Sequence, residues 1–183
     1  KILARVRHAQ GRTGEATQAE HDEVQKIIAQ KNIGPRPVLQ GDLVERFKKL
    51  SAEMICTVAE VKSENEVPDA CCDYLRLNNL PLTGAAWREL KHLDWHGAGL
   101  DLAFDRAMGD DAIGITSVFA ALAETGTLML LSGENTAASV SLVPETHIAV
   151  LHKNRIVPYM EDAWALLRKE KGELPRAVNF VSG

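Results

Sequence analysis

The chain has 183 residues, of which 45% are hydrophobic and 25% are charged. This composition is typical of one globular domain and excludes a disordered, collagen-like or coiled-coil chain. A chain of this length buries roughly 70% of its unfolded surface, so its core needs neither disulfides nor a structural metal. The net charge of −4 and the lack of long Lys or Arg runs argue against nucleic acid as a partner. The most apolar stretch, residues 113–131, is interrupted by Thr, Ser and Glu residues, so we predict no membrane span.

The three cysteines are Cys56 and the neighbouring pair Cys71 and Cys72. An odd and sparse set of this kind is typical of a reducing compartment, so we expect a cytoplasmic protein. We expect the neighbouring pair to be buried side chains rather than a redox switch. An iron–sulfur cluster normally needs four Cys ligands, so any electron relay would lie on another protein.

The first part of the chain is predicted to be helical. Thr17 to Glu20 forms a capping box ahead of a helix that the run 34–37, Gly-Pro-Arg-Pro, ends. A second helix is predicted over residues 42–50 from its starting Asp and its apolar stripe. Residues 1–50 are therefore expected to form a helical N-terminal segment.

Strand and helix patterns then alternate. Residues 54–61 are short and rich in Ile, Val and Thr, which predicts a buried strand. A helix from Ser63 to Leu75 follows, and further strands are predicted near 80–84 and, from apolar–polar alternation, at 100–105. This alternation implies an α/β sheet.

The second half of the chain predicts more strands and a closing helix. The strand candidates are residues 121–123, 128–131, 140–143 and 148–151. The first two flank a turn in which Gly126 supplies the tight bend, which predicts a β-hairpin. A helix after Pro158 presents Ala163 and Leu167 on its apolar stripe. We expect a single domain over residues 1–183, with a sheet-containing core at 51–183.

Familiar catalytic motifs are absent from the sequence. It contains no Walker loop, no G-x-S-x-G elbow and no H-E-x-x-H. The stretch 97–99, Gly-Ala-Gly, lacks the third glycine of a dinucleotide fingerprint and precedes a predicted strand. His92 and His96 are spaced to share one helical face, but no third ligand accompanies them, so we predict no metal site.

Several polar residues interrupt apolar, strand-forming sequence. They are Glu124, Thr125, Thr127, Ser132, Ser141 and His147. Ionisable groups in such surroundings are costly unless solvated, paired or functional. Glu124 is either an exposed residue of the hairpin turn or a carboxylate at the mouth of a pocket. His147 is either a core histidine satisfied by one hydrogen bond or an acid, base or anion-binding group.

Four segments resemble the lactate utilisation protein C family, whose members are LUD-domain proteins. They are Gly-Ile-Thr at 114–116, Ala-Glu-Thr-Gly-Thr at 123–127, Ser-Leu-Val-Pro at 141–144 and His-Ile-Ala-Val at 147–150. The opening residues 2–7 resemble the family's first helix, and residues 180–183 resemble the start of its last motif. We therefore expect the chain to lack residues at both ends, including the family's final strands.

The resemblance implies a fold. It is a three-layer α/β sandwich similar to the NagB/RpiA/CoA-transferase-like group, with a mainly helical N-terminal part. The strands and helices predicted from periodicity are compatible with this fold but do not select it by themselves.

The resemblance also implies a function that is carried out together with other proteins. The chain would be a subunit of an iron–sulfur-dependent system that oxidises L-lactate to pyruvate, with the clusters on partner proteins and none on this chain. Two alternatives stay open. One is a non-catalytic docking or assembly subunit, and the other is a small-molecule enzyme of the cyclo-ligase or CoA-transferase-like type, for which no Gly-rich phosphate loop is present.

In the enzymatic hypothesis Glu124 and His147 are the catalytic candidates. Glu124 would act as acid, base or carboxylate clamp, and His147 would orient a small 2-hydroxy acid. The proposed substrate-binding residues are Thr125, Gly126, Thr127, Ser141 and Pro144. Because two carboxylates repel each other, this hypothesis requires Glu124 to be protonated or to face a hydroxyl of the substrate.

Overall fold

A computed structural model describes residues 2–11, 14–30 and 33–183. The chain divides into two compact units, Lys1–Val38 and Leu39–Gly183. The second predicted helix, which we expected in the helical segment 1–50, belongs to the second unit. In the described residues, no helix combines the length and the apolar character that a membrane span requires.

The first unit contains two helices, α1 (Ile2–Ala9) and α2 (Gln18–Gln30). The predicted capping box begins α2, because the Thr17 N–H donates to Glu20 Oε2 at 2.7 Å and the Glu20 N–H donates to Thr17 Oγ1 at 3.3 Å. No described residue of either helix is buried. The two helices therefore do not enclose a core within the first unit.

The helices of the second unit begin where the sequence provides caps. Asp42 caps α3 (Leu43–Glu53), because its Oδ1 accepts the N–H groups of Val44 and Glu45. The predicted helix after Ser63 appears as a 3₁₀ turn, η1 (Glu64–Glu66), continued by α4 (Val67–Leu77). The remaining helices are η2 (Arg88–Leu90), α5 (Trp95–Ala98), α6 (Ser139–Leu142), η3 (Lys153–Arg155) and α7 (Met160–Lys171).

Eight strands form two sheets. A parallel sheet has the order β2-β1-β3-β6, with β1 Thr83–Ala86, β2 Asp101–Ala103, β3 Ile113–Ser117 and β6 Thr146–Val150. A mixed sheet has the order β7-β4-β5-β8, with β4 Ala120–Leu122, β5 Thr127–Leu131, β7 Ile156–Val157 and β8 Val178–Val181. The predicted hairpin is confirmed, since β4 and β5 pair antiparallel and Gly126 has φ +69°. The chain passes almost directly from β3 into β4, which connects the two sheets.

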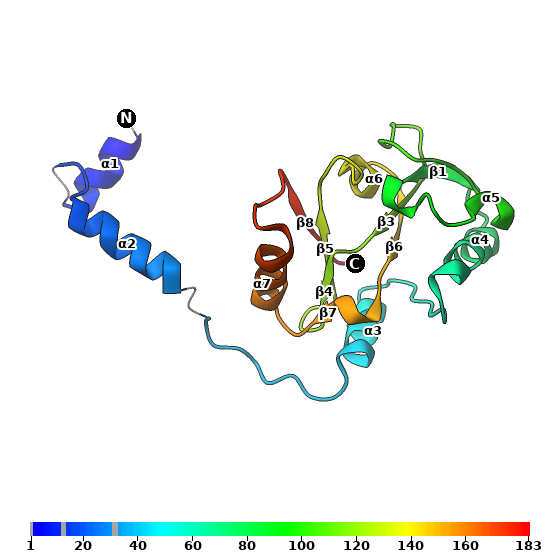
Figure 1. Cartoon of the computed structure of the whole chain (residues 1–183), viewed down its shortest axis with the longest axis horizontal. Helices are drawn as coiled ribbons and strands as arrows, with labels where there is room; N and C mark the ends of the chain where they lie inside the picture. The colour runs from blue at the N-terminus through cyan, green and yellow to red at the C-terminus, as the bar shows by residue number, and fades with distance from the viewer. Residues whose placement is uncertain (1, 12–13, 31–32) are drawn as a thin grey trace. The chain divides into compact units, whose positions relative to one another are not determined.

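Helices flank both sheets of the second unit (Figure 1). Ile113 and Ile115 of β3 are fully buried against Leu75 of α4 and its neighbours. On the mixed sheet, Leu122 and Met129 pack against Leu167 of α7. A third cluster lies between the two sheets and α6. This arrangement is consistent with the expected three-layer α/β fold.

The strand predicted at residues 54–61 is wrong. After α3 the chain takes a left-handed conformation at Ile55, with φ +66°, and then runs without regular structure along the surface. Ile55 is 94% exposed, and Glu60 forms an ion pair with Lys48 of α3. A β-branched run indicates a strand only where a neighbouring strand can pair with it, and here no strand does.

The strand predicted at residues 140–143 is also wrong. Ser139–Leu142 forms the short helix α6, whose Val140 is fully buried. A short apolar run fits a buried strand and a buried helical turn equally well by periodicity. The backbone of α6 lies close to β3, because a Cβ on Gly114 would lie 1.9 Å from the Val140 carbonyl oxygen.

Gly126 allows the β4–β5 turn to approach α3. A Cβ at this position would lie 2.8 Å from Met54 Cε and 3.0 Å from Leu50 Cβ. The side chain of Arg46 reaches the same turn, donating from Nε to the Ala123 carbonyl at 2.9 Å and from Nη2 to the Glu124 carbonyl at 3.3 Å. The turn is therefore fixed to α3 by close packing and by two hydrogen bonds.

We expect Gly126→Ala to destabilise the protein more than Gly41→Ala. Both glycines have positive φ, which costs an L-residue roughly 1–2 kcal/mol. A Cβ at Gly41 would meet nothing within 4 Å, whereas overpacking at Gly126 should cost about 1–3 kcal/mol more. Urea unfolding of the two variants measures the difference. Equal losses would show that Met54 moves aside and that the close approach does not depend on glycine.

Candidate functional site

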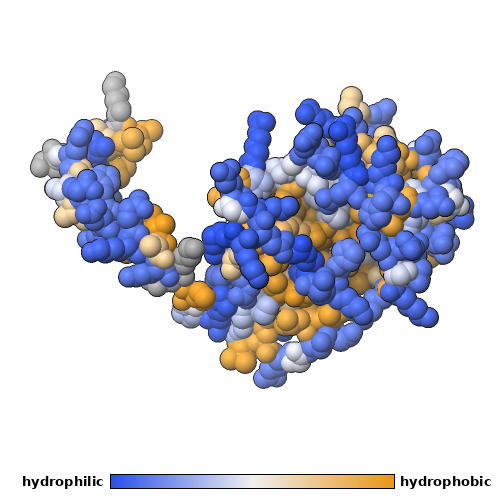
Figure 2. Space-filling view, viewed as in Figure 1, coloured by the Kyte–Doolittle hydropathy of each residue, from blue (hydrophilic) through white to orange (hydrophobic). Residues whose placement is uncertain are grey.

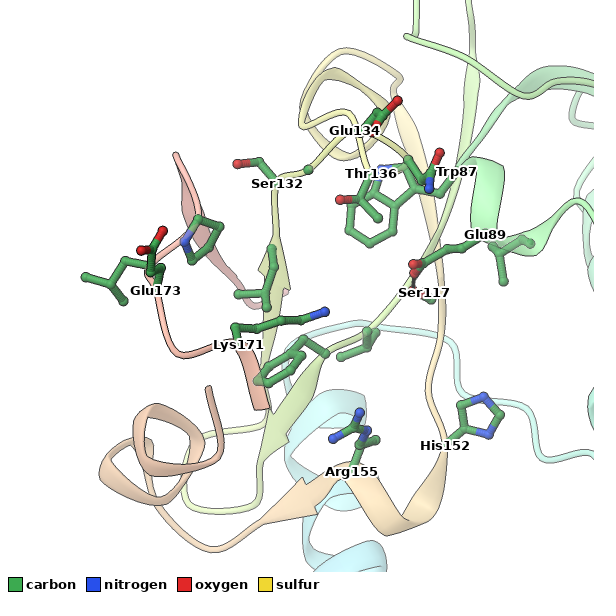
Figure 3. Close-up of a pocket in the computed structure, with 18 of the residues that line it drawn as sticks. Trp87, Glu89, Ser117, Ser132, Glu134, Thr136, His152, Arg155, Lys171 and Glu173 are labelled. Carbon is green, nitrogen blue, oxygen red and sulfur yellow. Dashed lines mark hydrogen bonds between the residues drawn. The ribbon is translucent and has the colours of Figure 1, made fainter. Parts of the chain in front are cut away.

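A cavity of about 640 Å³ lies at the carboxyl ends of the parallel strands (Figure 3). Trp87 follows β1, Ser117 ends β3, and His152 follows β6. In the parallel sheet, β2 pairs with one side of β1 and β3 pairs with the other. The connections after β1 and after β2 therefore lead to opposite sides of β1, which makes the β1–β3 boundary a topological switch point. Open α/β sheets bind ligands at this kind of switch point. The cavity is therefore the candidate functional site.

One wall of the cavity carries a carboxylate and a hydroxyl. The Ser117 hydroxyl donates to the Glu89 carboxylate, which joins the segment after β1 to the end of β3. Trp87, two residues before Glu89, is buried, and its indole Nε1 donates to the Ala137 carbonyl at 2.9 Å. This wall can accept a hydrogen bond from a ligand hydroxyl at Glu89 and offer a second hydroxyl at Ser117.

A polar loop after β5 forms the upper part of the cavity. Ser132 is paired with Ala177, since its N–H donates to the Ala177 carbonyl at 3.0 Å and its Oγ accepts the Ala177 N–H at 2.8 Å. Farther along, the Asn135 carbonyl accepts the Arg88 N–H at 3.1 Å. The side chains of Glu134 and Asn135 make no hydrogen bond with any residue that the structure describes, so they are available to a ligand.

The opposite side of the cavity carries two cations. Arg155 is paired with Glu170 through two hydrogen bonds of 2.7 and 3.0 Å, and its guanidinium lies over the Phe119 ring. These hydrogen bonds lower the pKa of the Glu170 carboxyl. The Lys171 side chain, at the end of α7, makes no hydrogen bond within the described part of the chain, and in Figure 3 it extends into the cavity. Lys171 is thus the cation best placed to meet an anionic ligand.

Glu64 brings two histidines together beside the cavity. Its Oε1 lies 3.3 Å from His92 Nε2 and 3.8 Å from His152 Nε2. His92 Nδ1 also lies 2.8 Å from the Glu89 carbonyl. Residues 2–11, 14–30 and 33–183 contain no cluster of His, Cys, Asp and Glu arranged to hold a metal ion. His92 and His96 do not share a helix, because only His96 lies in α5.

The predicted residues around Glu124 lie at the β4–β5 turn, away from the cavity lining. The Glu124 N–H donates to the Pro158 carbonyl at 3.0 Å, and the Thr125 hydroxyl donates to Thr127 Oγ1 at 2.8 Å. The half-buried Glu124 carboxylate makes no hydrogen bond with a described residue. Gly126 faces α3.

Ser141, Pro144 and His147 form a second group, around α6 and β6. The Ser141 hydroxyl donates to the Ala138 carbonyl at 3.0 Å, and Pro144 lies close to Gly114 of β3. His147 Nε2 lies 2.8 Å from Thr116 Oγ1, a fully buried hydroxyl. No hydrogen bond among the described residues joins this group to Glu124, and the catalytic roles of Glu124 and His147 stay predictions.

Sequence reasoning missed most of the cavity. Most of the segments that line it follow strands, the exceptions being Glu64 of η1 and the residues at the end of α7, and of the polar lining residues only Ser132 was predicted as a site candidate. The missed residues are Glu64, Glu89, Ser117, Glu134, Asn135, Thr136, His152, Arg155, Lys171 and Glu173. One sequence signal could have indicated the site. Polar residues directly follow the predicted strands at 128–131 and 148–151, and residues in that position lie at the carboxyl ends of the strands. Strand order cannot be read from local sequence patterns, so the meeting of these segments could not be predicted.

Partial burial of His147 makes stability depend on pH. It lowers the pKa of the imidazole to about 4, below its ordinary value of 6.5. As pH falls from 6.5 towards 4, the unfolded chain gains a proton that the folded chain does not, so stability is lost in this window and is fully present above it. We expect this residue to account for about 2 kcal/mol of the loss between pH 7 and pH 5.

The test compares free energies of unfolding of the wild type and His147→Gln at pH 7 and pH 5. The variant lacks the titrating group, so its stability should fall less over this interval. Equal falls in the two proteins would contradict a neutral, half-buried imidazole.

The fold and the cavity define an α/β protein with a polar site at the carboxyl edge of a parallel sheet. The chain belongs to the LUD domain family, whose model matches residues 6–183.

Curated relatives carry the name lactate utilization protein C. The protein from Bacillus licheniformis is 37% identical over 93 residues, which cover 49% of this chain and 38% of that protein. The protein from Halalkalibacterium halodurans is 38% identical over 111 residues, which cover 59% and 47%. The protein from Geobacillus sp. is 43% identical over 74 residues, which cover 39% and 31%. The chain therefore spans less than half the length of these relatives in each alignment.

A solved structure has the same fold. The crystal structure of a DUF162 family protein from Deinococcus radiodurans superposes with a TM-score of 0.61 and 19% sequence identity. The superposition covers 80% of this chain and 90% of the other. At this identity the likeness concerns the fold alone.

Proposed function

We propose that this chain is a component of a lactate utilisation system, in which L-lactate is oxidised to pyruvate and the electrons pass to iron–sulfur proteins. The family membership and the names of the relatives support a role in lactate utilisation. The oxidation itself and the partner proteins are proposed here from the resemblance of the sequence to the lactate utilisation protein C family.

The number and burial of the cysteines support the proposal that the iron–sulfur clusters lie on the partner proteins. Its three thiols are fewer than the four that a cluster normally takes. Cys71 and Cys72 are buried in α4, whereas Cys56 is exposed on the loop after α3. Burial raises the pKa of the Cys71 thiol to about 12, and metals bind the thiolate form. In this proposal the chain contributes ligand binding and proton transfer, and the partners hold the redox centres.

The cavity supports a site for a 2-hydroxy acid, and its two walls are the observation that carries this proposal. Lys171 extends into the cavity towards the wall that holds Glu89 and Ser117 (Figure 3). An ammonium binds a carboxylate, and a carboxylate accepts a hydrogen bond from a hydroxyl. A 2-hydroxy acid presents both groups. The other carboxylates in the lining make a second anionic group on the ligand unfavourable, because like charges repel.

We expect Lys171→Met to weaken binding of L-lactate about tenfold or more, because a hydrogen bond to a charged group contributes about 1.5–3 kcal/mol. Methionine keeps an unbranched side chain and removes the charge. Lys169→Met is the matched control, since Lys169 lies in the same last turn of α7 but outside the cavity lining. Titration of both variants with L-lactate, followed by NMR, measures the effect. Equal affinities would remove Lys171 from the site.

Growth of a deletion strain tests the biological role. A strain without the gene should fail to grow on L-lactate, grow normally on pyruvate, and recover when the intact gene is restored. Equal growth on both carbon sources, in a strain with no other lactate oxidase, would contradict the proposed role.

Expression of the Glu124→Gln variant in the deletion strain distinguishes a chemical role of Glu124 from a docking role. The substitution keeps the shape of the side chain and removes its charge, so a chemical role predicts lost lactate oxidation with intact assembly of the complex. Lost assembly, followed by co-purification of the partner proteins, would instead favour the docking alternative. Normal growth with normal assembly would contradict both roles.

A further inference from the structure

The cavity is larger than L-lactate requires. Lactate has as many non-hydrogen atoms as benzene, for which a cavity of about 150 Å³ is sufficient. The cavity of this protein measures about 640 Å³, which lies within the range of sites for considerably larger molecules. A lactate molecule bound between Lys171 and the wall of Glu89 and Ser117 therefore leaves most of the cavity to another part of a ligand.

The polar loop after β5 provides groups that the two lactate contacts do not use. The side chains of Asn135 and Thr136 belong to the cavity lining and make no hydrogen bond with any residue that the structure describes. In Figure 3, Thr136 lies above the level of Lys171 and Ser117. A carboxamide and a hydroxyl both donate and accept hydrogen bonds, as the alcohol groups of a ligand do. The loop can therefore bind a carbon chain that carries hydroxyl groups.

Charge argues against a second acidic group on this chain. The cationic side chains of the lining besides His152 are Lys171 and Arg155, and Arg155 is already paired with Glu170. The acidic side chains of the lining are Glu64, Glu89, Glu134 and Glu173. A second carboxylate or a phosphate would meet this excess of negative charge. Uncharged polar groups avoid the repulsion and still satisfy the amide of Asn135.

An apolar chain fits the loop poorly. Hydrocarbon laid against Asn135 and Thr136 would remove water from their polar groups without replacing the hydrogen bonds that the water makes. Val118 and Leu131 of the lining are buried, so they offer little surface to a ligand. On the face of the second unit that Figure 2 shows, apolar side chains likewise lie between hydrophilic ones. The free polar groups of the loop thus favour hydroxyls over hydrocarbon.

We propose that the cavity binds a 2-hydroxy acid whose carbon chain carries further hydroxyl groups, which is a polyhydroxylated monocarboxylate of the aldonate class. Its carboxylate and 2-hydroxyl make the contacts proposed for L-lactate, and Asn135 and Thr136 bind hydroxyls farther along the chain. A six-carbon aldonate has about twice the non-hydrogen atoms of lactate and needs roughly 300 Å³, which the cavity provides. This inference rests on the proposed function, because it uses the same contacts at Lys171 and Glu89.

Three acids test the ligand class on the whole chain. L-Lactate is the reference, and D-mannonate has the same configuration at C2 with hydroxyls on each further carbon. (S)-2-Hydroxyhexanoate has the same chain length as D-mannonate without the further hydroxyls. We expect D-mannonate to bind about fivefold or more tightly than L-lactate, because it adds hydrogen bonds, and 2-hydroxyhexanoate to bind no more tightly than L-lactate. Titrations followed by NMR measure the three affinities.

Two variants locate the added contacts. Asn135→Leu and Thr136→Val remove the polar groups and nearly keep the size of the side chains. Each should weaken binding of D-mannonate about fivefold and leave binding of L-lactate unchanged. Asn154→Leu is the matched control, since Asn154 is exposed and lies outside the cavity lining. Equal losses for both acids would overturn the assignment of the loop to the additional hydroxyls.

The outcomes separate this inference from the proposed function. Binding of D-mannonate no tighter than that of L-lactate would overturn the inference and leave the proposed lactate site in place. Binding of D-mannonate without binding of L-lactate would support the inference and contradict lactate as the ligand of this cavity. Tightest binding of 2-hydroxyhexanoate, or of (S)-4-amino-2-hydroxybutyrate, would overturn the inference in favour of an apolar or a cationic chain. Growth of the deletion strain tests the role in lactate utilisation independently of these affinities.

Discussion

Parallel pairing of β3 with β1 on one side and β6 on the other is the constraint on which the second unit depends. Because the three strands run in the same direction, their carboxyl ends meet at one edge. Ile113 and Ile115 anchor the middle strand in the core, where both are fully buried. The same edge then presents polar groups from distant parts of the chain, and the cavity forms there because backbone pairing has already fixed the strands.

Close contacts hold the family-like segments against neighbouring elements. Gly114 allows α6 to lie against β3, and Gly126 allows the hairpin turn to lie against α3. Arg46 adds hydrogen bonds to carbonyls of the same turn. The segments that were predicted from the sequence to hold catalytic or binding residues therefore also have a packing role. A side chain at Gly114 would have to displace the backbone of α6, and one at Gly126 would have to displace the side chains of Met54 and Leu50, which close-packed proteins accommodate poorly.

Local patterns predicted much of the fold. The capping box of α2, Asp42 at the start of α3 and the glycine turn between β4 and β5 all appear as expected, because each depends on neighbouring residues. The strand predicted at 54–61 failed because strand formation needs a partner, and the one predicted at 140–143 failed because a short apolar run fits two structures. The candidate site was harder to predict, since Glu89, Ser117 and Lys171 are far apart in the sequence.

The sequence by itself determined the α/β class, the helix starts, the hairpin and the resemblance to LUD-domain proteins, all of which depend on short-range patterns or ordered motifs. Tertiary structure alone decided the order of the strands and therefore which polar residues share the cavity. It also decided that the half-buried His147 lies beside Thr116 while Glu124 lies at a separate turn. The physical reason is that strand order is set by long-range burial and hydrogen bonding, which no local window of the chain contains.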